Sequence, residues 1–150
     1  MEYTIKNGEV FNASGKKLGS KDKDGYIVVN ILTKLGRKLV RAHRYIYEHY
    51  NGPIKPGLEI DHINGIKDDN RIENLRLANT NQNQWNSKIR IDNKSGVKGV
   101  SWNNKAKKWA ARIKHNKIRY NLGHFKTVSD AKEIIEKKRL ELHGEFARNN

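Results

Sequence analysis

The feature that most constrains the fold is the spacing of polar residues around one short apolar segment. Residues 58–62 read Leu-Glu-Ile-Asp-His, and an Asn-Gly pair follows at 64–65. Asn74 lies twelve residues beyond His62, and Asn83 lies twenty-one residues beyond it. An Asn-Gly pair after an apolar run is a strong turn signal. The segment therefore predicts a short strand that ends in a turn and leads into a polar loop.

The flanking residues predict a helix before this strand and a second strand and helix after it. Residues 42–50 carry apolar or aromatic side chains at the spacing of one helix face. Residues 74–78 read as a strand, and Asn79 or Thr80 can cap a helix that runs toward Lys88.

The aspartate, histidine and asparagines carry the groups that hydrolysis of a phosphodiester requires. A neutral histidine can take a proton from the attacking water, because the reference pKa of histidine is about 6.5. Asp61 and Asn83 offer oxygen ligands of the kind that a hard divalent cation prefers. Neighbouring side chains on a strand point to opposite faces, so we expect a bend or strand end at His62. Asn74, on the opposite strand, could hold this region by hydrogen bonds.

The net charge indicates a polyanionic partner. The chain of 150 residues carries a formal charge of +15, with a pI near 10.0, which favours binding to nucleic acid. Its sequence has no apolar run of about 18 residues and opens without a signal peptide, so we expect no membrane partner and a cytoplasmic protein that is not secreted. Zero cysteines exclude disulfides and thiolate zinc sites.

Length and composition favour two small α+β units. A hydrophobic fraction of 35% suits surface-rich units better than one large core. Residues 1–91 predict β-hairpins followed by the strand and helix pattern described above. Residues 92–96 are polar and turn-prone, which indicates a linker. Residues 97–150 predict a three-stranded antiparallel sheet packed on one helix.

The predicted sheet has one strongly basic face. Strands are expected at residues 97–102, 108–114 and 117–122, and an amphipathic helix at 127–143, with Ser129 as a plausible cap. Alternation on the middle strand places lysine and arginine on one face and Trp109, with its apolar neighbours, on the other. Such a face can meet phosphates and base edges in the major groove.

Residues 40–90 resemble the HNH nuclease motif, whose ββα-metal fold holds one cation. The resemblance rests on Asp61-His62-Ile63-Asn64-Gly65, the run from Asn70 to Leu75, and Asn83, and it is nearest to the phage and intron-encoded homing endonucleases. It implies His62 as general base and Asn74 as the residue that orients it. It also implies Asp61 and Asn83 as ligands of one divalent cation, Mg²⁺ or Mn²⁺. The last ligand is asparagine here, whereas other branches use histidine, and the cysteine pairs that bind structural zinc in some relatives are missing, so no structural zinc is expected.

His43 is a further candidate at the start of the first helix, with a structural or phosphate-contacting role. The remaining histidines are expected to be structural or at the surface: His49, His115, His124 and His143.

The C-terminal segment resembles the ethylene-response-factor type of DNA-binding domain, the Apetala-two fold. The motifs are Gly96 to Trp102, Lys108 to Ile113, Asn121 to Phe125, and the closing His143 to Ala147. In that family the sheet reads the major groove. The positions that this resemblance assigns to DNA contact are Lys98, Ser101, Lys108, Arg112, Lys114, Arg119 and Asn121. Ser101 and Asn121 differ from the plant members, so no target sequence can be carried over.

Together these patterns predict a homing-type DNA endonuclease in which the HNH unit cuts and the C-terminal sheet holds double-stranded DNA. One active site should nick one strand, so a monomer would nick and a dimer could cut both strands; no protein partner is evident. The alternative is a non-catalytic, sequence-specific DNA-binding regulator that retains an HNH scaffold. An RNA-binding protein is a weaker third reading.

Overall fold

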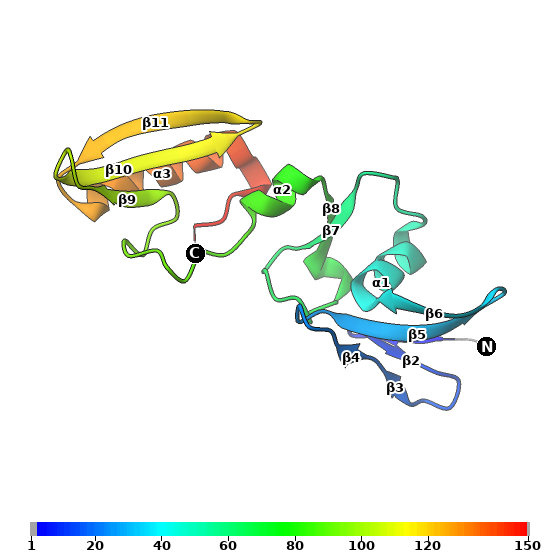
Figure 1. The fold of residues 1–150 in the computed structure, drawn as a ribbon. Coiled ribbons are helices and arrows are strands. Elements are labelled where there is room, and N and C mark those ends of the chain that lie inside the picture. Colours follow the sequence, from blue (N-terminus) through cyan, green and yellow to red (C-terminus); the bar gives the residue numbers. More distant parts are fainter. Residues whose placement is uncertain (1–2, 150) are drawn as a thin grey trace. The chain divides into compact units, whose positions relative to one another are not determined.

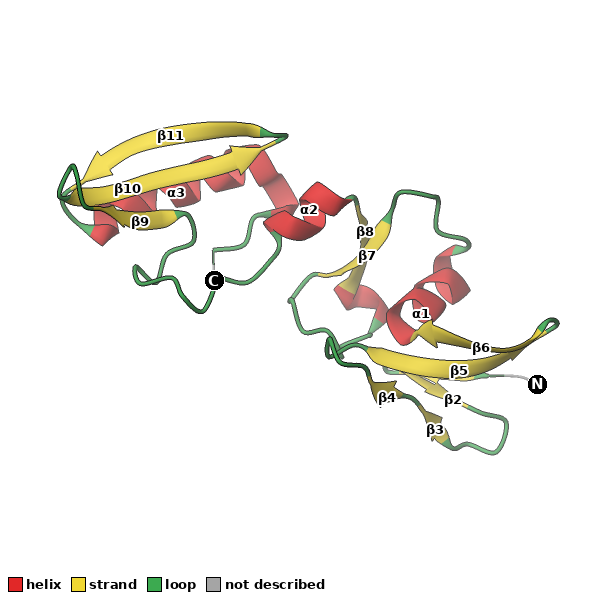
Figure 2. Ribbon diagram, viewed as in Figure 1, coloured by secondary structure: helices red, strands yellow, loops and turns green. Residues whose placement is uncertain are grey.

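The computed structural model describes residues 3–149, and these fold as two compact α+β units (Figures 1 and 2). The first unit is Met1–Thr80 and the second is Asn81–Asn150. None of the described helices is long and apolar enough to cross a membrane.

Two small sheets open the first unit. Strands β1 (Thr4–Lys6), β2 (Glu9–Phe11) and β3 (Lys17–Leu18) form one antiparallel sheet in that order. Strands β4 (Ser20–Lys21), β5 (Ile27–Thr33) and β6 (Gly36–Arg41) form the second, also antiparallel.

Helix α1 and the hairpin-like pair of β7 and β8 complete the first unit. Helix α1 (Ala42–Asn51) follows β6 directly, and β7 (Glu59–His62) pairs antiparallel with β8 (Leu75–Ala78), preceded by a short 3-10 turn at Ile72–Asn74. Residues from both sheets, α1, β7 and β8 share one apolar core, in which Ile46 has 0% exposure. This shared core fixes β7 against α1, because close-packed side chains leave few alternative arrangements.

The second unit is a sheet covered on one face by a helix. Strands β9 (Val100–Asn103), β10 (Lys108–His115) and β11 (Ile118–Phe125) form an antiparallel sheet in the order β11-β10-β9. Helix α3 (Val128–His143) lies along it, and a 3-10 turn at Gly144–Phe146 follows (Figure 1). Trp109 packs against the core of this unit, as its place on the apolar face predicts.

Helix caps and boundaries differ from the sequence-based expectation in two places. Helix α2 (Thr80–Trp85) ends before Lys88. At this end the carbonyl groups of Trp85 and Ser87 accept hydrogen bonds from Lys98 Nζ at 2.8 and 2.6 Å. Helix α3 is capped by Thr127 rather than Ser129, since the Thr127 hydroxyl accepts from Asp130 N at 3.1 Å.

The compact units divide at the first residue of α2, whereas the sequence placed a linker at residues 92–96. Residues 81–91 were assigned to the N-terminal domain but are grouped with the C-terminal one. The contacts of Trp85 explain this grouping: its ring stacks on His143 and His115 at centroid distances of 4.4 and 4.6 Å.

Candidate functional site

The end of β7 carries the Asp61-His62 pair into the interior of the first unit. Asp61 is 4% exposed and His62 is 5% exposed. His62 is the last residue of β7, and its carbonyl accepts from Gly65 N at 2.8 Å, so the strand ends in the expected turn. Asp61 lies opposite Arg76 in the ladder, and His62 lies opposite Leu75.

Asn70 is the direct partner of the His62 ring. Its Oδ1 lies 3.0 Å from His62 Nε2, and Asn70 is 2% exposed. With this oxygen as acceptor, Nε2 donates the proton and the lone pair of the neutral ring is on Nδ1. Sequence reasoning missed this role, although the position of Asn70 within the run from Asn70 to Leu75 was a signal that could have found it.

Asn74 fixes the loop that follows His62 rather than touching the imidazole. Its Oδ1 accepts from Asn64 N at 3.0 Å, and its Nδ2 donates to Asn64 Oδ1 at 3.0 Å and to Asp69 O at 2.7 Å. Ile63 N donates to the Asn74 carbonyl at 2.9 Å. Asn74 thus holds both ends of the loop that carries Asn70, and so acts on His62 through Asn70.

Charged pairs clamp the same loop from outside. Arg71 donates two hydrogen bonds to the Asp69 carboxylate, at 2.8 and 2.7 Å, and these hold the pKa of Asp69 well below its usual range. Asn64 Nδ2 donates to Asp69 Oδ2 at 2.7 Å. Lys21 pairs with Asp68 at 2.6 Å, which ties β4 to the loop.

Gly8 brings the first hairpin against this loop. It lies in the tight Asn7-Gly8 turn between β1 and β2 with φ of +75°. A Cβ added there would lie 2.4 Å from Arg71 N and 2.6 Å from the Asn70 carbonyl carbon. Only glycine therefore allows the hairpin to support the backbone of Asn70 at this distance.

We expect Gly8→Ala to destabilise the first unit far more than Gly15→Ala. Both glycines have φ of +75°, but a Cβ at Gly15 would meet nothing within 4 Å. The shared backbone strain costs about 1–2 kcal/mol, and the clash at Gly8 should add about 1–3 kcal/mol more. Urea unfolding followed by NMR signals of Ile46 measures the difference. Equal losses of unfolding free energy in the two variants would show that Gly8 does not lie close to the backbone of Asn70 and Arg71 in solution.

His43 packs directly on His62. The two ring centroids are 5.1 Å apart in an edge-to-face arrangement, and Tyr26 lies 5.2 Å from His43 and 6.0 Å from His62. His43 is 7% exposed, and its Nδ1 is buried without a hydrogen-bond partner. Burial, then electrostatic effects of His62, Arg41 and Arg44, lower the pKa of His43 to about 3. His43 is therefore a buried neutral ring packed against His62.

The lowered pKa of His43 predicts a loss of stability in acid. The unfolded chain protonates this histidine below a pH of about 6.5, whereas the folded chain does so only near 3. Between these values the unfolded state binds more protons, so stability falls as the pH falls. Lowering the pH from 7 to 5 should cost about 2 kcal/mol through this group at about 1.36 kcal/mol per pH unit below 6.5.

The measurement is urea unfolding of the first unit at pH 7 and pH 5, in the chain itself and in His43→Phe. The variant keeps an aromatic ring at position 43 but has no titratable group there. Its free energy of unfolding should therefore fall by about 2 kcal/mol less than that of the original chain between pH 7 and pH 5. An identical loss in both chains would contradict the buried neutral state of His43.

The oxygen donors expected to bind a cation are divided between the two units. Asp61 belongs to the first unit, where its Oδ2 accepts from Arg76 Nε at 2.8 Å; Asn83 belongs to α2 in the second unit. Among residues 3–149, no group of three or more His, Cys, Asp or Glu side chains gathers as a metal site. A cation at Asp61 would therefore complete its shell with amide, phosphate or water oxygens, which Mg²⁺ accepts.

The second unit places six of the seven proposed DNA contacts on one sheet face. Residues directly opposite each other in an antiparallel ladder share a face, and Arg112 pairs with Asn121, Lys114 with Arg119, and Ala110 with Ser101. Alternation along β10 adds Lys108 to this face. All six side chains are exposed: Ser101, Lys108, Arg112, Lys114, Arg119 and Asn121.

Lys98 is the exception, because it does not lie on this sheet face. It precedes β9 and turns inward, where its Nζ donates to the carbonyls of Trp85 and Ser87. The Lys98 side chain thus holds residues 85–87 in place and lies at the edge of the proposed sheet surface.

Comparison with known proteins shows which family this chain resembles. Residues 40–85 match the model for "HNH endonuclease", the segment from the end of β6 through α2. The chain is 37% identical over 111 residues to protein 3.8 of Escherichia phage T7, an alignment that covers 74% of this chain and 91% of that one.

Two further relatives are named as HNH proteins or DNA endonucleases. The chain is 36% identical to the uncharacterized HNH endonuclease L560 of Acanthamoeba polyphaga mimivirus, over 85% of this chain and 64% of that one. It is 34% identical to the DNA endonuclease I-HmuI of Bacillus phage SP01, over 59% of this chain and 52% of that one.

A solved structure of DNA binding and cleavage by the HNH homing endonuclease I-HmuI overlaps with a TM-score of 0.47 and 25% identity, covering 94% of this chain and 84% of that one. Asp61, His62, Asn74 and Asn83 lie inside the segment that matches the family model. The chain therefore belongs to the HNH endonuclease family, with its HNH domain at residues 40–85.

Proposed function

We propose that the chain is a site-specific DNA endonuclease of the homing type, which hydrolyses phosphodiesters with one divalent cation. The observation that carries this proposal is the buried His62, held by Asn70 and directly following the buried Asp61 in the chain, inside the HNH segment. The name of the relative I-HmuI, a DNA endonuclease, supports DNA as the substrate.

In the proposed reaction His62 Nδ1 accepts a proton from water while the water oxygen forms a bond to phosphorus. The bond from phosphorus to the 3′-oxygen breaks, and that oxygen leaves with a proton from solvent, giving 5′-phosphate and 3′-hydroxyl ends. Asn70 keeps the ring in the required tautomer, and Asn74 keeps Asn70 in place. Asp61 and Asn83 would hold the cation, Mg²⁺ or Mn²⁺, which would neutralise charge on the phosphate and the leaving oxygen.

The C-terminal sheet is proposed as the tether to double-stranded DNA, in the manner of an Apetala-two type domain. Its exposed face carries Lys108, Arg112, Lys114 and Arg119, and acidic residues do not interrupt it within the ladder. Separating tether from cutting site is physically sensible, since a small cation site has few contacts left to read sequence.

Incubation with supercoiled plasmid tests the enzyme. Nicking that requires Mg²⁺ or Mn²⁺ and stops with chelator is the expected result, and ligation of the nick by a DNA ligase checks the 5′-phosphate. A folded chain that binds DNA but does not nick with either metal would contradict the proposal.

One observation favours the non-catalytic DNA-binding regulator as the second candidate. The Asp61 carboxylate already accepts from Arg76 at 2.8 Å, and a cation must share or displace this partner. The plasmid assay decides between the two, because the regulator would bind the plasmid without cutting it.

A further inference from the structure

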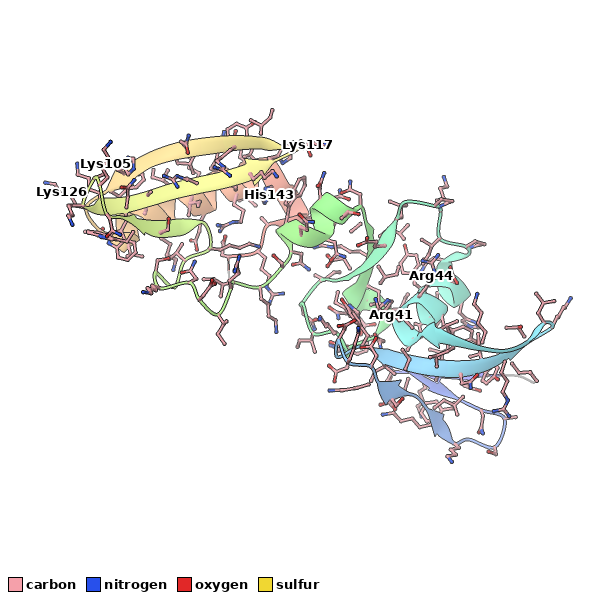
Figure 3. All side chains as sticks on the ribbon, in the orientation of Figure 1. Arg41, Arg44, Lys105, Lys117, Lys126 and His143 are labelled. Atoms are coloured by element: carbon pink, nitrogen blue, oxygen red, sulfur yellow. The ribbon has the colours of Figure 1, made fainter. Side chains whose placement is uncertain are left out.

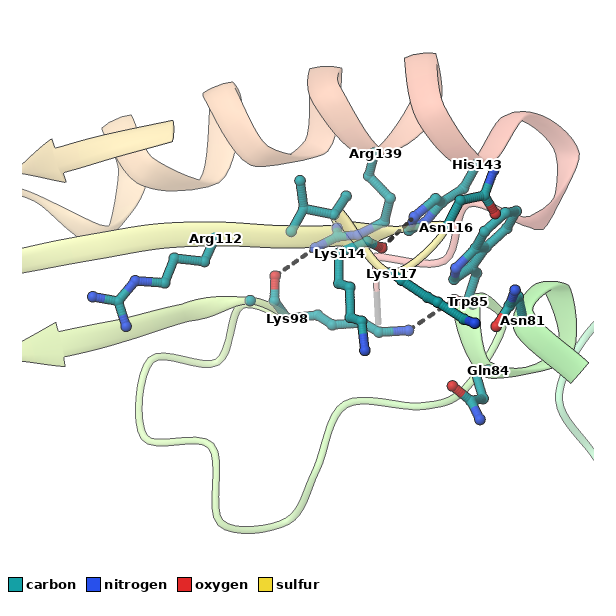
Figure 4. Close-up of a pocket in the computed structure, with 12 residues that line it drawn as sticks. Asn81, Gln84, Trp85, Lys98, Arg112, Lys114, Asn116, Lys117, Arg139 and His143 are labelled. Carbon is teal, nitrogen blue, oxygen red and sulfur yellow. Dashed lines mark hydrogen bonds between the residues drawn. The ribbon is translucent and has the colours of Figure 1, made fainter. Parts of the chain in front are cut away.

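The second unit contains a pocket of about 270 Å³ at the open edge of its sheet (Figure 4). Strand β9 pairs with β10 from Lys108 to Ala111, and Arg112 N donates to Gly99 O at 2.9 Å where this ladder ends. The pocket lies along the remaining residues of β10, so side chains from that strand, α2 and α3 can reach it.

The described lining of this pocket is strongly basic. It includes no aspartate or glutamate, and its five cationic side chains are Lys98, Arg112, Lys114, Lys117 and Arg139. Five like charges around one hollow repel one another unless an anion enters it.

Two of these cations are bound by neutral oxygens. Arg139 is 2% exposed and donates to the Lys98 carbonyl and to Asn149 Oδ1. Lys98 Nζ donates to the carbonyls of Trp85 and Ser87 (Figure 4). Burial, with Arg139 and Arg148 nearby, lowers the pKa of Lys98 to about 8. The Glu136 carboxylate on α3 favours the charged form of Arg139. The charged groups that influence the pKa of Lys98 are the positive Arg139 and Arg148.

Trp85 gives the pocket a rigid wall. Its ring lies 4.4 Å from His143 and 4.6 Å from His115, and the two imidazoles are 5.7 Å apart. If the two imidazoles lay on opposite faces of the indole, their centroids would be separated by about the sum of their distances to Trp85, which is well above 5.7 Å. Both imidazoles therefore cover the same face of Trp85, which fixes the indole beside the cations.

We propose that this pocket binds a phosphate group, and that in the complex this is a backbone phosphate of DNA lying on the sheet face. The second part rests on the proposed function of that face. Arg112 and Lys114 belong both to the face and to the pocket, so a strand that follows the face meets the pocket at its edge. The proposal assigns phosphate binding to Lys117, which lies in the turn between β10 and β11 and lines the pocket.

The first test uses inorganic phosphate and the full chain. At ionic strength held constant with chloride, phosphate should give a saturable NMR shift of the Trp85 indole N–H and the Gly99 amide. Lys117→Gln should weaken this binding at least threefold, whereas Lys126→Gln should not. The two lysines are both exposed and lie at opposite ends of the sheet (Figure 3). Shifts no larger than those produced by chloride, or equal effects of the two variants, would overturn the site.

The second test identifies the source of the phosphate. For a labelled duplex, the slope of log affinity against log salt should become shallower by about 0.9 in Lys117→Gln, the value for one lost phosphate contact, and stay unchanged in Lys126→Gln. Phosphate binding without this change in slope would overturn DNA as the source. Neither measurement depends on plasmid nicking, so failure of the endonuclease proposal is seen separately.

Discussion

His62→Ala should abolish nicking while DNA affinity stays within about twofold of the original chain. A positioned general base contributes about 10²–10⁴-fold to rate, and the His62 ring is the proposed base. His62 is buried in the first unit, so its removal leaves the basic sheet of the second unit unchanged. Nicking rates on supercoiled plasmid with Mg²⁺, and anisotropy titrations of a labelled duplex in chelator, give the two quantities.

Because His62 is buried, the alanine variant alone could lose activity by unfolding. In His62→Gln the side-chain amide can still donate a hydrogen bond to Asn70 in place of the histidine Nε2–H. The glutamine has no basic nitrogen, so this variant should fold and remain inactive. His49→Ala is the matched control, since His49 is exposed on α1 and belongs to the same unit. Wild-type nicking by a folded His62→Gln chain would remove His62 as the base.

Changing Arg112 and Lys114 together to alanine should weaken DNA binding much more than it slows cleavage of bound DNA. Both side chains are exposed on the β10 face and pair across to Asn121 and Arg119. Two lost phosphate contacts should reduce affinity roughly 60-fold at about 0.1 M salt, at about 0.9 log unit per phosphate per log unit of salt. Single-turnover cleavage of saturated plasmid should change by less than about threefold.

The control for net charge is the double change of Lys105 and Lys126 to alanine. These lysines are exposed at the other end of the same sheet (Figure 3), and their removal lowers the charge of the chain equally. A similar loss of affinity in both double variants would mean that net charge, rather than this part of the face, binds the DNA.

The sequence nominates catalytic candidates, but it does not predict their contacts. Spacing and resemblance propose Asp61, His62 and Asn74, because those signals are local. The supporting residues were not found in these roles: Asn70 bonds His62, His43 packs on it, and Gly8 supports the loop. Each of these contacts joins residues from different elements, and neither periodicity nor turn chemistry specifies how separate elements meet.

Lys98 shows the same limit in the second unit. Its sequence context is that of an exposed basic strand, yet its amino group satisfies the carbonyls at the end of α2. A carbonyl at a helix end needs a donor, and the donor to Trp85 O lies thirteen residues away in the sequence.

By itself the sequence determined the α+β class, the alternation that makes one sheet face basic, and the order of acid, imidazole and amide in the nuclease segment. These follow from backbone geometry with periods of two and 3.6 residues and from turn residues, all of which act over a few positions. The tertiary structure alone decided that His62 is held by Asn70, that His43 is neutral beside it, and that Lys98 and Arg139 meet in one pocket. Such outcomes depend on burial and on distances between remote residues, because the cost of leaving a polar group unpaired arises only once the chain has packed around it.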